Sequence, residues 1–401
     1  MQSWLTCTVI IVCIAYYLYI PIPENAAEPW KQRFTYSAFK VINDVARVAG
    51  VLGFSKINVT RSGLGFYPLL DWLISKPIYD IKLVDDVFDG VKVRLYYPRA
   101  SEAKLTPAVV YFHGGGWVFL DADKYDNVME RLSTTTEFIT IFVEYRKAPE
   151  HIFPAAFDDC VKATLYLLQK GENHGVDSKR IGLAGDSAGG NLAMAVSLKI
   201  GEQQLKLPPL RFQVLIYPTL QALDLTLSSF KEFDIPARQE CTLVSKGLMI
   251  FWLNMYAFGH LKYTDSFVNN SHVTSASKKR YRKLVDPKLL PEKYQTVPND
   301  DVESSIPNVH NVEKILLNPY YAPLMMTDKQ LQTLPKTLIM TCDIDGLRDE
   351  GYILAARMRN IGHDVKHENY KGMDHGFIWF SYYNAFKEGN TNFSSYVKTN
   401  M

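Results

Sequence analysis

The chain has 401 residues, of which 47% are hydrophobic and 21% charged, with 44 basic against 42 acidic side chains. This length and apolar fraction allow a large buried core and exclude an intrinsically disordered protein. The near-neutral charge provides no broad electrostatic surface for nucleic acid, so no nucleic-acid partner is expected. Five cysteines in a chain of this length exclude a scaffold built on disulfides.

The N-terminal segment is the first distinctive feature. Residues 1–23 contain no charged side chain, and 4–20 are almost wholly apolar or aromatic. This apolar run is at the lower length limit for a helix that crosses a bilayer, and Pro21 and Pro23 then end the helix. The pattern predicts a transmembrane signal-anchor over 1–23. A cleaved signal peptide and a buried helix are the alternatives, although the missing basic n-region argues against cleavage.

The orientation of this segment depends on opposing signals. Lys31 and Arg33 follow the apolar run and by themselves favour a cytoplasmic body, although two glutamates before them weaken this bias. Three glycosylation sequons favour the opposite orientation, and they begin at Asn58, Asn269 and Asn392. We therefore expect a single-pass protein with a lumenal body, and secretion after signal cleavage is the alternative.

Apolar positions at helical spacing predict N-terminal cap helices over 24–80, and from residue 81 short strands alternate with helices. This alternation predicts a mostly parallel, doubly wound α/β sheet in a catalytic domain over 81–401, with an opening hairpin that turns at Asp89 and Gly90. Segment 219–316 breaks the alternation, so we expect an insertion that packs with 24–80 over the carboxyl edge of the sheet. The predicted strands are 81–84, 91–97, 108–112, 138–144, 181–184, 212–216, 337–341 and 365–370, and the predicted helices are 158–170, 188–200 and 349–360.

The run Gly185–Gly189 reads Gly-Asp-Ser-Ala-Gly, follows a short apolar strand and opens a helix. This context is typical of a nucleophile elbow, in which small residues two positions on either side allow a tight, strained turn at the serine. We interpret Ser187 as the nucleophile, with Gly185 and Gly189 permitting the turn. A glycine-rich turn without catalysis is the alternative, but it would not require a serine at its apex.

The run His113–Gly116 reads His-Gly-Gly-Gly and directly follows the predicted strand 108–112. Glycines let the backbone approach an ester and direct N–H groups at its carbonyl oxygen, where negative charge develops during acyl transfer. We expect the N–H groups of Gly114, Gly115 and Ala188 to form an oxyanion hole, with Gly116 completing the motif. His113 is expected to hold the loop through its ring and not to act as a base. A flexible turn is the alternative.

A serine nucleophile needs a base, and the base needs an orienting acid. In a fold of this kind the chain order is serine, acid, histidine, and both late partners follow strands. Of the nine histidines, His375 is the one that follows the last predicted strand, where it lies close to Gly372 and Gly376. Asp345 is the expected acid, but Asp343 and Asp349 are close and stay open. Asp349 also suits the N-terminus of the following helix, where the helix dipole stabilises a carboxylate.

Together these motifs resemble the hormone-sensitive-lipase branch of the α/β-hydrolases, and with the apolar N-terminus the whole chain resembles the arylacetamide deacetylase-like family. The resemblance rests on His113–Gly116, Tyr145–Glu150, Phe153–Ala156, Gly185–Asn191, Asp345–Gly351 and Asp374–Phe377. It implies an α/β-hydrolase fold and a serine esterase or amidase anchored in the endoplasmic reticulum membrane, with its catalytic domain in the lumen and without a metal or other cofactor. It places the nucleophile, acid and base at Ser187, Asp345 and His375.

The chain departs from this family at one position that affects a disulfide. Some relatives have a cysteine after the glycine loop where this chain has Val118, so no disulfide from there to Cys342 is expected. The pairing of Cys160 and Cys241 stays open. A second departure, Lys147 where the family has leucine, does not touch the predicted chemistry.

The predicted activity is hydrolysis of apolar carboxylic esters or amides with a short acyl group, as in deacetylases and lipases. Two alternatives use the same fold. One is a catalytically silent binding protein, which would usually lack a member of the triad. The other is a serine peptidase, which usually carries a large additional domain for which this chain has no room.

Overall fold

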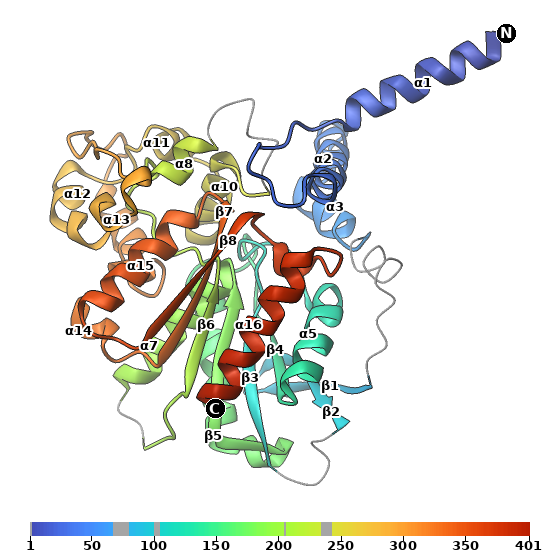
Figure 1. The fold of residues 1–401 in the computed structure, drawn as a ribbon. Coiled ribbons are helices and arrows are strands. Elements are labelled where there is room, and N and C mark those ends of the chain that lie inside the picture. The colour runs from blue at the N-terminus through green and yellow to red at the C-terminus, as the bar shows by residue number, and fades with distance from the viewer. Residues whose placement is uncertain (1, 67–79, 100–104, 204–205, 234–242) are drawn as a thin grey trace.

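An eight-stranded sheet with the strand order β1-β2-β4-β3-β5-β6-β7-β8 forms the centre of the molecule. Figure 1 shows it in the computed structural model, which describes residues 2–66, 80–99, 105–203, 206–233 and 243–401. The pairs β1–β2 and β2–β4 are antiparallel, and every other pair is parallel. The predicted mostly parallel α/β architecture is therefore confirmed.

Every strand predicted from the sequence is present, and β1, β5, β7 and β8 are at least four residues longer than predicted. The strands are β1 (Ile81–Phe88), β2 (Val91–Pro98), β3 (Thr106–Phe112), β4 (Ile139–Glu144), β5 (Val176–Asp186), β6 (Phe212–Ile216), β7 (Lys336–Ile344) and β8 (Val365–Asp374). The central strands read as continuous apolar runs because helices cover both faces of the sheet, and all of β6 is buried.

Helices cover both faces of this sheet: α5 and α16 pack together on one face, and α6 and α7 on the other (Figure 1). The sequence predicted α6, α7 and α15 but not α5 or α16. The helices of the sheet layer are α5 (Ala122–Thr136), α6 (Ala155–Lys170), α7 (Ala188–Glu202), α14 (Asp328–Leu331), α15 (Arg348–Asn360) and α16 (Asn384–Asn400).

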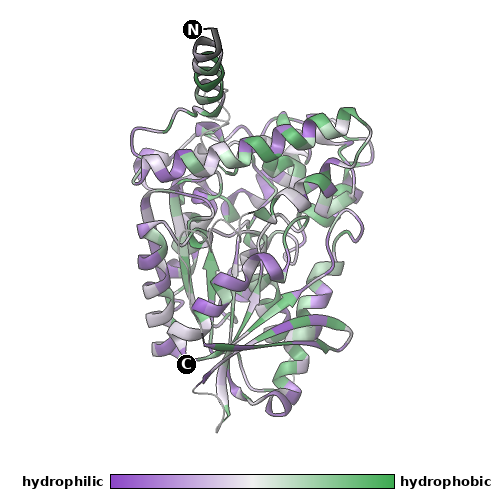
Figure 2. Ribbon diagram, turned by 90° about the vertical axis from the view of Figure 1, so that its right-hand side faces the viewer, coloured by the Kyte–Doolittle hydropathy of each residue, from purple (hydrophilic) through white to green (hydrophobic). Residues whose placement is uncertain are grey.

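The N-terminal region contributes α1 (Gln2–Leu18), α2 (Pro29–Val51) and α3 (Lys56–Gly63), and Figure 2 shows α1 rising from the body above α2. Among the described residues, no helix combines the length and hydropathy that crossing a membrane requires. The signal-anchor over 1–23 therefore stays a prediction. Part of the predicted helical region 24–80, residues 67–79, lies outside the described residues.

Helix α2 is tied to the C-terminal part of the chain, just before the predicted catalytic histidine. The carbonyl oxygen of Gly372 accepts hydrogen bonds from the Gln32 side chain at 3.0 Å and from the Ala27 N–H at 2.8 Å. The hydroxyls of Thr35 and Tyr383 lie 2.8 Å apart in the buried layer beneath α2. The N-terminal cap is thus joined to the end of β8 and to the start of α16 by several buried polar contacts.

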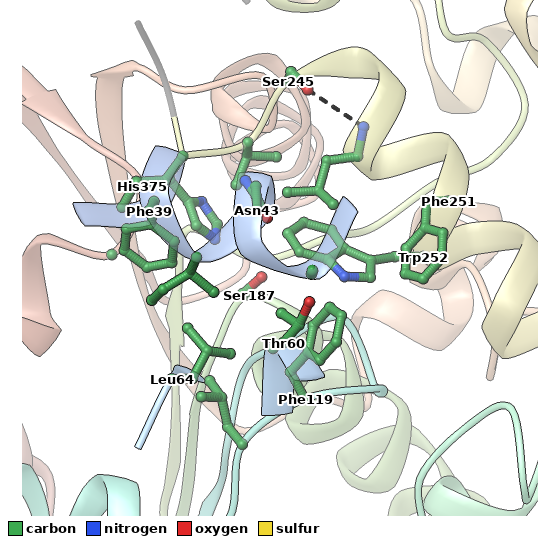
Figure 3. A pocket seen from close by; sticks show the side chains of 18 of the residues that line it. Phe39, Asn43, Thr60, Leu64, Phe119, Ser187, Ser245, Phe251, Trp252 and His375 are labelled. Carbon is green, nitrogen blue, oxygen red and sulfur yellow. Dashed lines mark hydrogen bonds between the residues drawn. The ribbon is translucent and has the colours of Figure 1, made fainter. Parts of the chain in front are cut away.

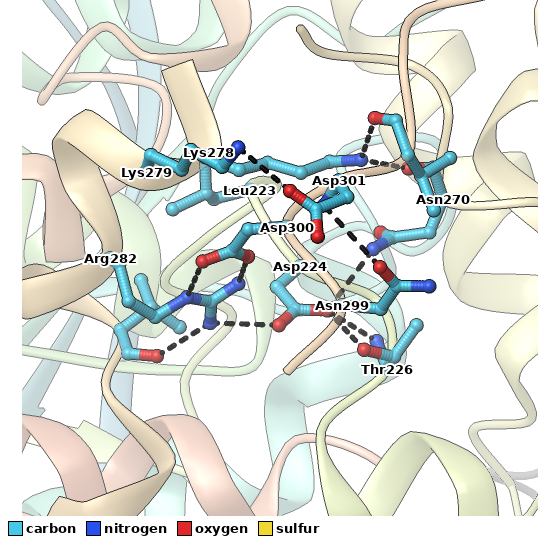
Figure 4. A network of polar contacts seen from close by, with 12 residues as sticks. Leu223, Asp224, Thr226, Asn270, Lys278, Lys279, Arg282, Asn299, Asp300 and Asp301 are labelled. Carbon is cyan, nitrogen blue, oxygen red and sulfur yellow. Dashed lines mark hydrogen bonds and ion pairs between the residues drawn. The ribbon is translucent and has the colours of Figure 1, made fainter. Parts of the chain in front are cut away.

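The insertion 219–316 folds into α8 (Ser228–Glu232), α10 (Lys246–Phe258), α11 (Thr264–Val268), α12 (Ser275–Tyr281) and α13 (Val309–Leu316). A buried polar network ties its parts together (Figure 4). The guanidinium of Arg282 lies 2.8 Å from the carboxylate of Asp224, which is 1% exposed, and also pairs with Asp300. Burial opposes ionisation of Asp224, but Arg282 and the donors of Thr226 keep its pKa below its usual value.

Removing Arg282 should therefore destabilise the fold. In Arg282→Ala the buried carboxylate of Asp224 loses its counter-ion, and we expect the free energy of unfolding in urea to fall by about 3 kcal/mol. The matched control is Lys279→Ala, since the Lys279–Asp301 pair lies in solvent with side chains 59% and 84% exposed. That control should show no measurable change. Equal stability of the two variants would contradict a supporting role for the buried network.

Candidate active site

Ser187 occupies a sharp turn between β5 and α7. Its backbone has φ 56° and ψ −119°, a conformation that L-residues with side chains rarely adopt. A side-chain carbon at Gly185 would lie 2.3 Å from the Gly189 carbonyl oxygen, and one at Gly189 would lie 1.8 Å from the Phe112 carbonyl oxygen. No side chain larger than hydrogen fits at either position, which is the local geometry that the sequence predicted for a nucleophile elbow.

His375 follows β8, and its Nδ1 atom lies 2.9 Å from the Oδ2 atom of Asp345. Asp345 follows β7 and is fully buried, and its second oxygen accepts a hydrogen bond from the Leu347 N–H at 2.9 Å. A carboxylate held on Nδ1 leaves Nε2 of the ring to face a substrate or nucleophile. The arrangement can therefore hold one tautomer of the ring and stabilise its protonated form.

The two other candidate acids have different partners. Asp343 accepts a hydrogen bond from the Asn369 side chain at 2.7 Å, and Asp349 accepts one from the Ser229 N–H at 2.8 Å. Asp349 also lies in the first turn of α15, as expected for a carboxylate that interacts with a helix dipole. Of the three aspartates that the sequence left open, only Asp345 contacts the histidine.

Ser187 and His375 line a single cavity of about 650 Å³. Figure 3 shows the hydroxyl of Ser187 and the ring of His375 turned into this cavity. The roof comes from α2 and α3, and one wall comes from α10. Most of the lining is apolar, and it includes Phe39, Ile42, Leu64, Leu120, Leu243, Leu248 and Phe380.

Aromatic residues contribute to the cavity lining and to the core behind it. Phe119, Phe251 and Trp252 belong to the lining. Trp117, Tyr256 and Phe377 do not line the cavity and are buried in the core. Trp117 stacks on Tyr256 with ring centroids 4.3 Å apart, so these two rings support the loop from behind.

His113 is fully buried between aromatic rings, as expected of a residue that holds the glycine loop. Its ring stacks on Tyr145 with centroids 4.1 Å apart and on Phe142 at 5.1 Å. Burial lowers the pKa of His113 well below its usual value, so the ring is neutral at physiological pH. Its Nδ1 atom lies 2.8 Å from the carbonyl oxygen of Gly114, to which it donates a hydrogen bond.

The predicted role of Gly114 is wrong. Its N–H is donated to the hydroxyl of Tyr125 at 2.8 Å and to the Oδ1 atom of Asp186 at 3.0 Å. It therefore has no free hydrogen for a substrate oxygen. The sequence pattern could not show this, because three successive peptide groups can each face the substrate or the interior.

The N–H groups of the next two glycines are better placed than that of Gly114 to donate to a substrate oxygen. Because the Gly114 carbonyl faces the His113 ring, the planar trans peptide directs the N–H of Gly115 the opposite way. The carbonyl of Gly115 in turn accepts hydrogen bonds from the following loop, so the N–H of Gly116 points away from that loop. Ala188 is the first residue of α7, where N–H groups lack intrahelical acceptors. These three N–H groups are the candidate donors that remain.

Asp186 is a site residue that the sequence analysis did not identify. Its carboxylate accepts hydrogen bonds from the hydroxyls of Tyr111 and Tyr125, both at 2.9 Å, and from the Gly114 N–H. Burial raises the pKa of Asp186 to about 6, although these donors oppose the shift. Asp186 directly precedes Ser187, and its carboxylate thus ties the serine turn to the glycine loop. Asp186 stands between the first glycine and the serine of the motif, where the motif specifies no residue type, so the sequence did not predict this role.

The sequons occupy different environments. Asn58 is exposed on α3, and Asn269 is exposed at the C-terminal end of α11. Asn392 is half-buried on α16, and its side-chain amide donates a hydrogen bond to the hydroxyl of Tyr370 at 3.0 Å. Asn58 and Asn269 are therefore more accessible than Asn392.

The buried cysteines carry free thiols. Cys160 and Cys342 are both unpaired, which agrees with the expectation that Cys342 forms no disulfide with position 118. Burial raises the pKa of both thiols well above its usual value, so both are chemically inert. Cys241 lies outside the described residues.

Comparison with known proteins identifies the class. Residues 109–285 and 286–379 match a family described as the alpha/beta hydrolase fold. The chain belongs to this family. It is 31% identical to arylacetamide deacetylase of Oryctolagus cuniculus, over 94% of this chain and 93% of that protein. It is 32% identical to neutral cholesterol ester hydrolase 1 of Bos taurus, over 99% of this chain and 98% of that protein.

Solved structures of similar fold are esterases. An esterase of Pyrobaculum calidifontis matches with a TM-score of 0.66 and 25% identity, over 88% of this chain and 97% of that one. A thermostable esterase from Pseudomonas putida matches in fold with a TM-score of 0.65 and 24% identity, over 86% and 90% of the two chains. The predicted fold, the predicted family and the prediction of an enzyme of the ester-hydrolase class are thus confirmed.

The raised pKa of Asp186 predicts a pH-dependent effect on stability. The folded protein takes up a proton on this carboxyl near pH 6, whereas the unfolded chain does so only near pH 4. Between these values the folded state binds more protons, so this group destabilises the wild type progressively as the pH rises. The stability difference between Asp186→Asn and wild type should therefore increase from about pH 4 to about pH 6 and then level off.

Urea unfolding at a series of pH values measures this difference. The exposed Asp265 supplies a control, since Asp265→Asn should show no such slope in that window. A difference between Asp186→Asn and wild type that does not change with pH would contradict the assignment.

Proposed function

We propose that this protein is a serine hydrolase that cleaves apolar carboxylic esters or amides, with Ser187 as nucleophile, His375 as base and Asp345 as orienting acid. One observation carries the proposal: a strained serine and a histidine held by a buried carboxylate line the same apolar cavity. Relatives named as a deacetylase and a cholesterol ester hydrolase support an acyl group as the point of attack.

The proposed reaction has two halves. The Ser187 oxygen attacks the acyl carbonyl while the Nε2 atom of His375 takes the hydroxyl proton, and Asp345 stabilises the resulting imidazolium through Nδ1. The tetrahedral intermediate collapses to an acyl-enzyme as His375 protonates the departing alcohol or amine. Water then attacks the acyl-enzyme by the same path, and the carboxylic acid leaves.

The negative charge of the tetrahedral intermediate needs donors that are fixed before the reaction. We assign this role to the N–H groups of Gly115, Gly116 and Ala188. Their directions are set by the His113–Gly114 contact, by the glycine turn and by the start of α7. Loss of one donor from such a site typically raises the barrier by about 2.7–4 kcal/mol.

The cavity supports apolar substrates of moderate size. Its volume of about 650 Å³ lies within the range of small-molecule sites. The roof contributes polar side chains of α2 and α3 as well as apolar ones, but most of the lining is apolar, which favours an ester with an apolar alcohol or a short acyl chain over a charged peptide. A peptidase and a catalytically silent binding protein are the competing functions, and the experiments below separate them.

The second part of the proposal is a location in the endoplasmic reticulum membrane, with the catalytic domain in the lumen. α1 carries no charged side chain, and neither do the five residues after it. Its apolar side chains are exposed, among them Trp4, Ile11 and Val12. Exposed sequons at Asn58 and Asn269 support a lumenal domain. Secretion after signal cleavage is the alternative.

Labelling with a fluorophosphonate probe tests the nucleophile. The wild type should react, and Ser187→Ala should lose both labelling and ester hydrolysis. The control is Ser245→Ala, because Ser245 lines the same cavity but only caps α10. This control should keep its label. Labelling of Ser187→Ala, or no labelling of the wild type, would favour a silent binding protein.

The proposed triad also predicts a large but incomplete loss of rate when its acid is replaced. Asp345→Asn should leave the histidine in the wrong tautomer and reduce kcat by a factor of about 10⁴, as replacement of this acid does in serine proteases. Parallel assays with a short-chain nitrophenyl ester and a peptide amide measure the loss and the substrate class together. Preference for the peptide amide would point to a peptidase.

Glycosidase sensitivity tests the location. Protein from microsomes should shift to lower mass on deglycosylation, and Asn269→Gln should lack one glycan. Asn299→Gln is the matched control, since Asn299 is exposed in the same insertion but begins no sequon. Retention in the membrane fraction after alkaline extraction would support α1 as an anchor, and recovery in the medium would support cleavage. An unglycosylated protein would contradict the lumenal assignment.

A further inference from the structure

Helix α2 is apolar on two opposite faces. Its inner face, with Phe39, Ile42 and Ala46, forms part of the cavity roof. Its outer face carries a row of exposed apolar side chains at intervals of four, seven, four, three and four residues, with one gap of two turns after Phe34. We call this row the outer stripe, and its members are Trp30, Phe34, Val41, Val45, Val48 and Leu52.

The outer stripe is large. Its members are between 37% and 78% exposed, and Val51 and Phe54 extend it at 84% and 64%. At its C-terminal end Val45, Val48 and Leu52 also line a separate apolar hollow of about 410 Å³. A cap helix that only covers a pocket needs one apolar face, so a second one marks a surface with its own partner.

The chemistry at the border of the stripe indicates what the partner is. Arg33, Lys40 and Arg47 recur every seven residues along one edge. Asp44, the single acidic residue of α2, pairs with Lys40 at 3.8 Å and with Arg47 at 3.1 Å, so the edge keeps a net positive charge. Basic side chains beside an apolar helix face are typical of helices that lie in the headgroup region of a bilayer. A second apolar protein surface would gain nothing from this row of cations.

Exposed aromatic side chains lie at the junction of α1 and α2. Tyr16, Tyr19 and Trp30 meet where α1 ends and α2 begins, and they are 84%, 61% and 78% exposed. The guanidinium of Arg33 lies over the rings of Tyr19 and Trp30, at 5.0 Å and 4.9 Å from their centroids. Exposed Tyr and Trp beside a cation are the residues that settle at a membrane–water interface.

The two helices are joined in a geometry that fits a bilayer. Figure 2 shows α1 rising from the body while α2 lies across the top of the body beneath it. The Ser37 hydroxyl donates to the Leu18 carbonyl oxygen at 2.6 Å, and the Arg33 side chain donates to the Ile20 carbonyl oxygen at 3.0 Å. If α1 enters the apolar layer, these bonds place α2 along the layer's surface.

We propose that the outer stripe of α2 is a membrane-docking surface that lies in the headgroup region of the bilayer holding α1. The proposal rests on the function and location proposed above, and it adds a lipid contact that α1 does not make. Because the inner face of α2 roofs the cavity, docking brings the active site against the lipid. Apolar esters dissolved in the bilayer then reach Ser187 without crossing water.

A fluorescent probe on the full chain tests the contact directly. Cys7, Cys13 and Cys241 are replaced by alanine, a probe is attached at Val48→Cys, and the protein is reconstituted in vesicles with brominated acyl chains. The control probe is attached at Val297→Cys, because Val297 is 89% exposed in the distant insertion. Bromine should quench the probe at 48 and spare the probe at 297. Equal quenching, or none at 48, overturns the proposal.

A second experiment tests the consequence for the reaction. The substitutions Val45→Gln, Val48→Gln and Leu52→Gln keep helix propensity and add no charge. Hydrolysis of a long-chain ester dissolved in phosphatidylcholine vesicles should fall about tenfold, because binding scales with the apolar area inserted. Hydrolysis of a water-soluble short ester should be unchanged, since none of the three side chains lines the active-site cavity. Val297→Gln is the control and should change neither rate.

The outcomes separate this proposal from the proposed function. A wild type that hydrolyses neither ester contradicts the proposed function, while the quenching measurement still decides the lipid contact. An unchanged rate on vesicles in the triple variant overturns the docking surface alone. A wild type that forms dimers in vesicles and a triple variant that does not, with no quenching at 48, would make the stripe an interface between two copies and overturn the proposal.

Discussion

The close contact between the start of α7 and the end of β3 is the constraint on which the site depends. Gly189 comes so near the Phe112 carbonyl that no side chain fits, and this contact forces the backbone of Ser187 into its left-handed turn. The parallel strands β5, β7 and β8 all end at one edge of the sheet. The residues that follow them therefore lie close together. The serine, aspartate and histidine therefore meet although they are far apart in the chain.

Asp186 shows how the two glycine motifs act as one unit. Its carboxylate is buried beside the serine, and the hydrogen bonds from Tyr111, Tyr125 and the Gly114 N–H offset only part of the cost of that burial. The same bonds pull the first glycine of the loop inward and leave the following peptide groups free to face the cavity. Asp186 thus determines which peptide groups of the glycine loop are already engaged inside the protein.

Local patterns in the sequence were sufficient for the strands, the serine turn and the histidine, because each rests on apolar runs and small residues at fixed spacing. Helix α5 was missed although Tyr125, Met129 and Leu132 have helical spacing, since its charged and hydroxyl residues hide the pattern. The choice of Asp345 over its neighbours and the inward turn of Gly114 depend on contacts between distant segments. Those contacts exist only after the sheet has formed, so no local signal carries them.

The carbonyl of Gly372, three residues before His375, is held by Gln32 and Ala27, which belong to the N-terminal cap. The loop that carries the imidazole is therefore fastened to the same element that roofs the cavity. Truncation of the first 30 or so residues would remove part of this fastening as well as the apolar helix, so a shortened protein made for crystallisation would differ from the full chain in the alignment of its base. Rate constants measured on such a fragment would describe a protein in which the loop that carries His375 is held less firmly.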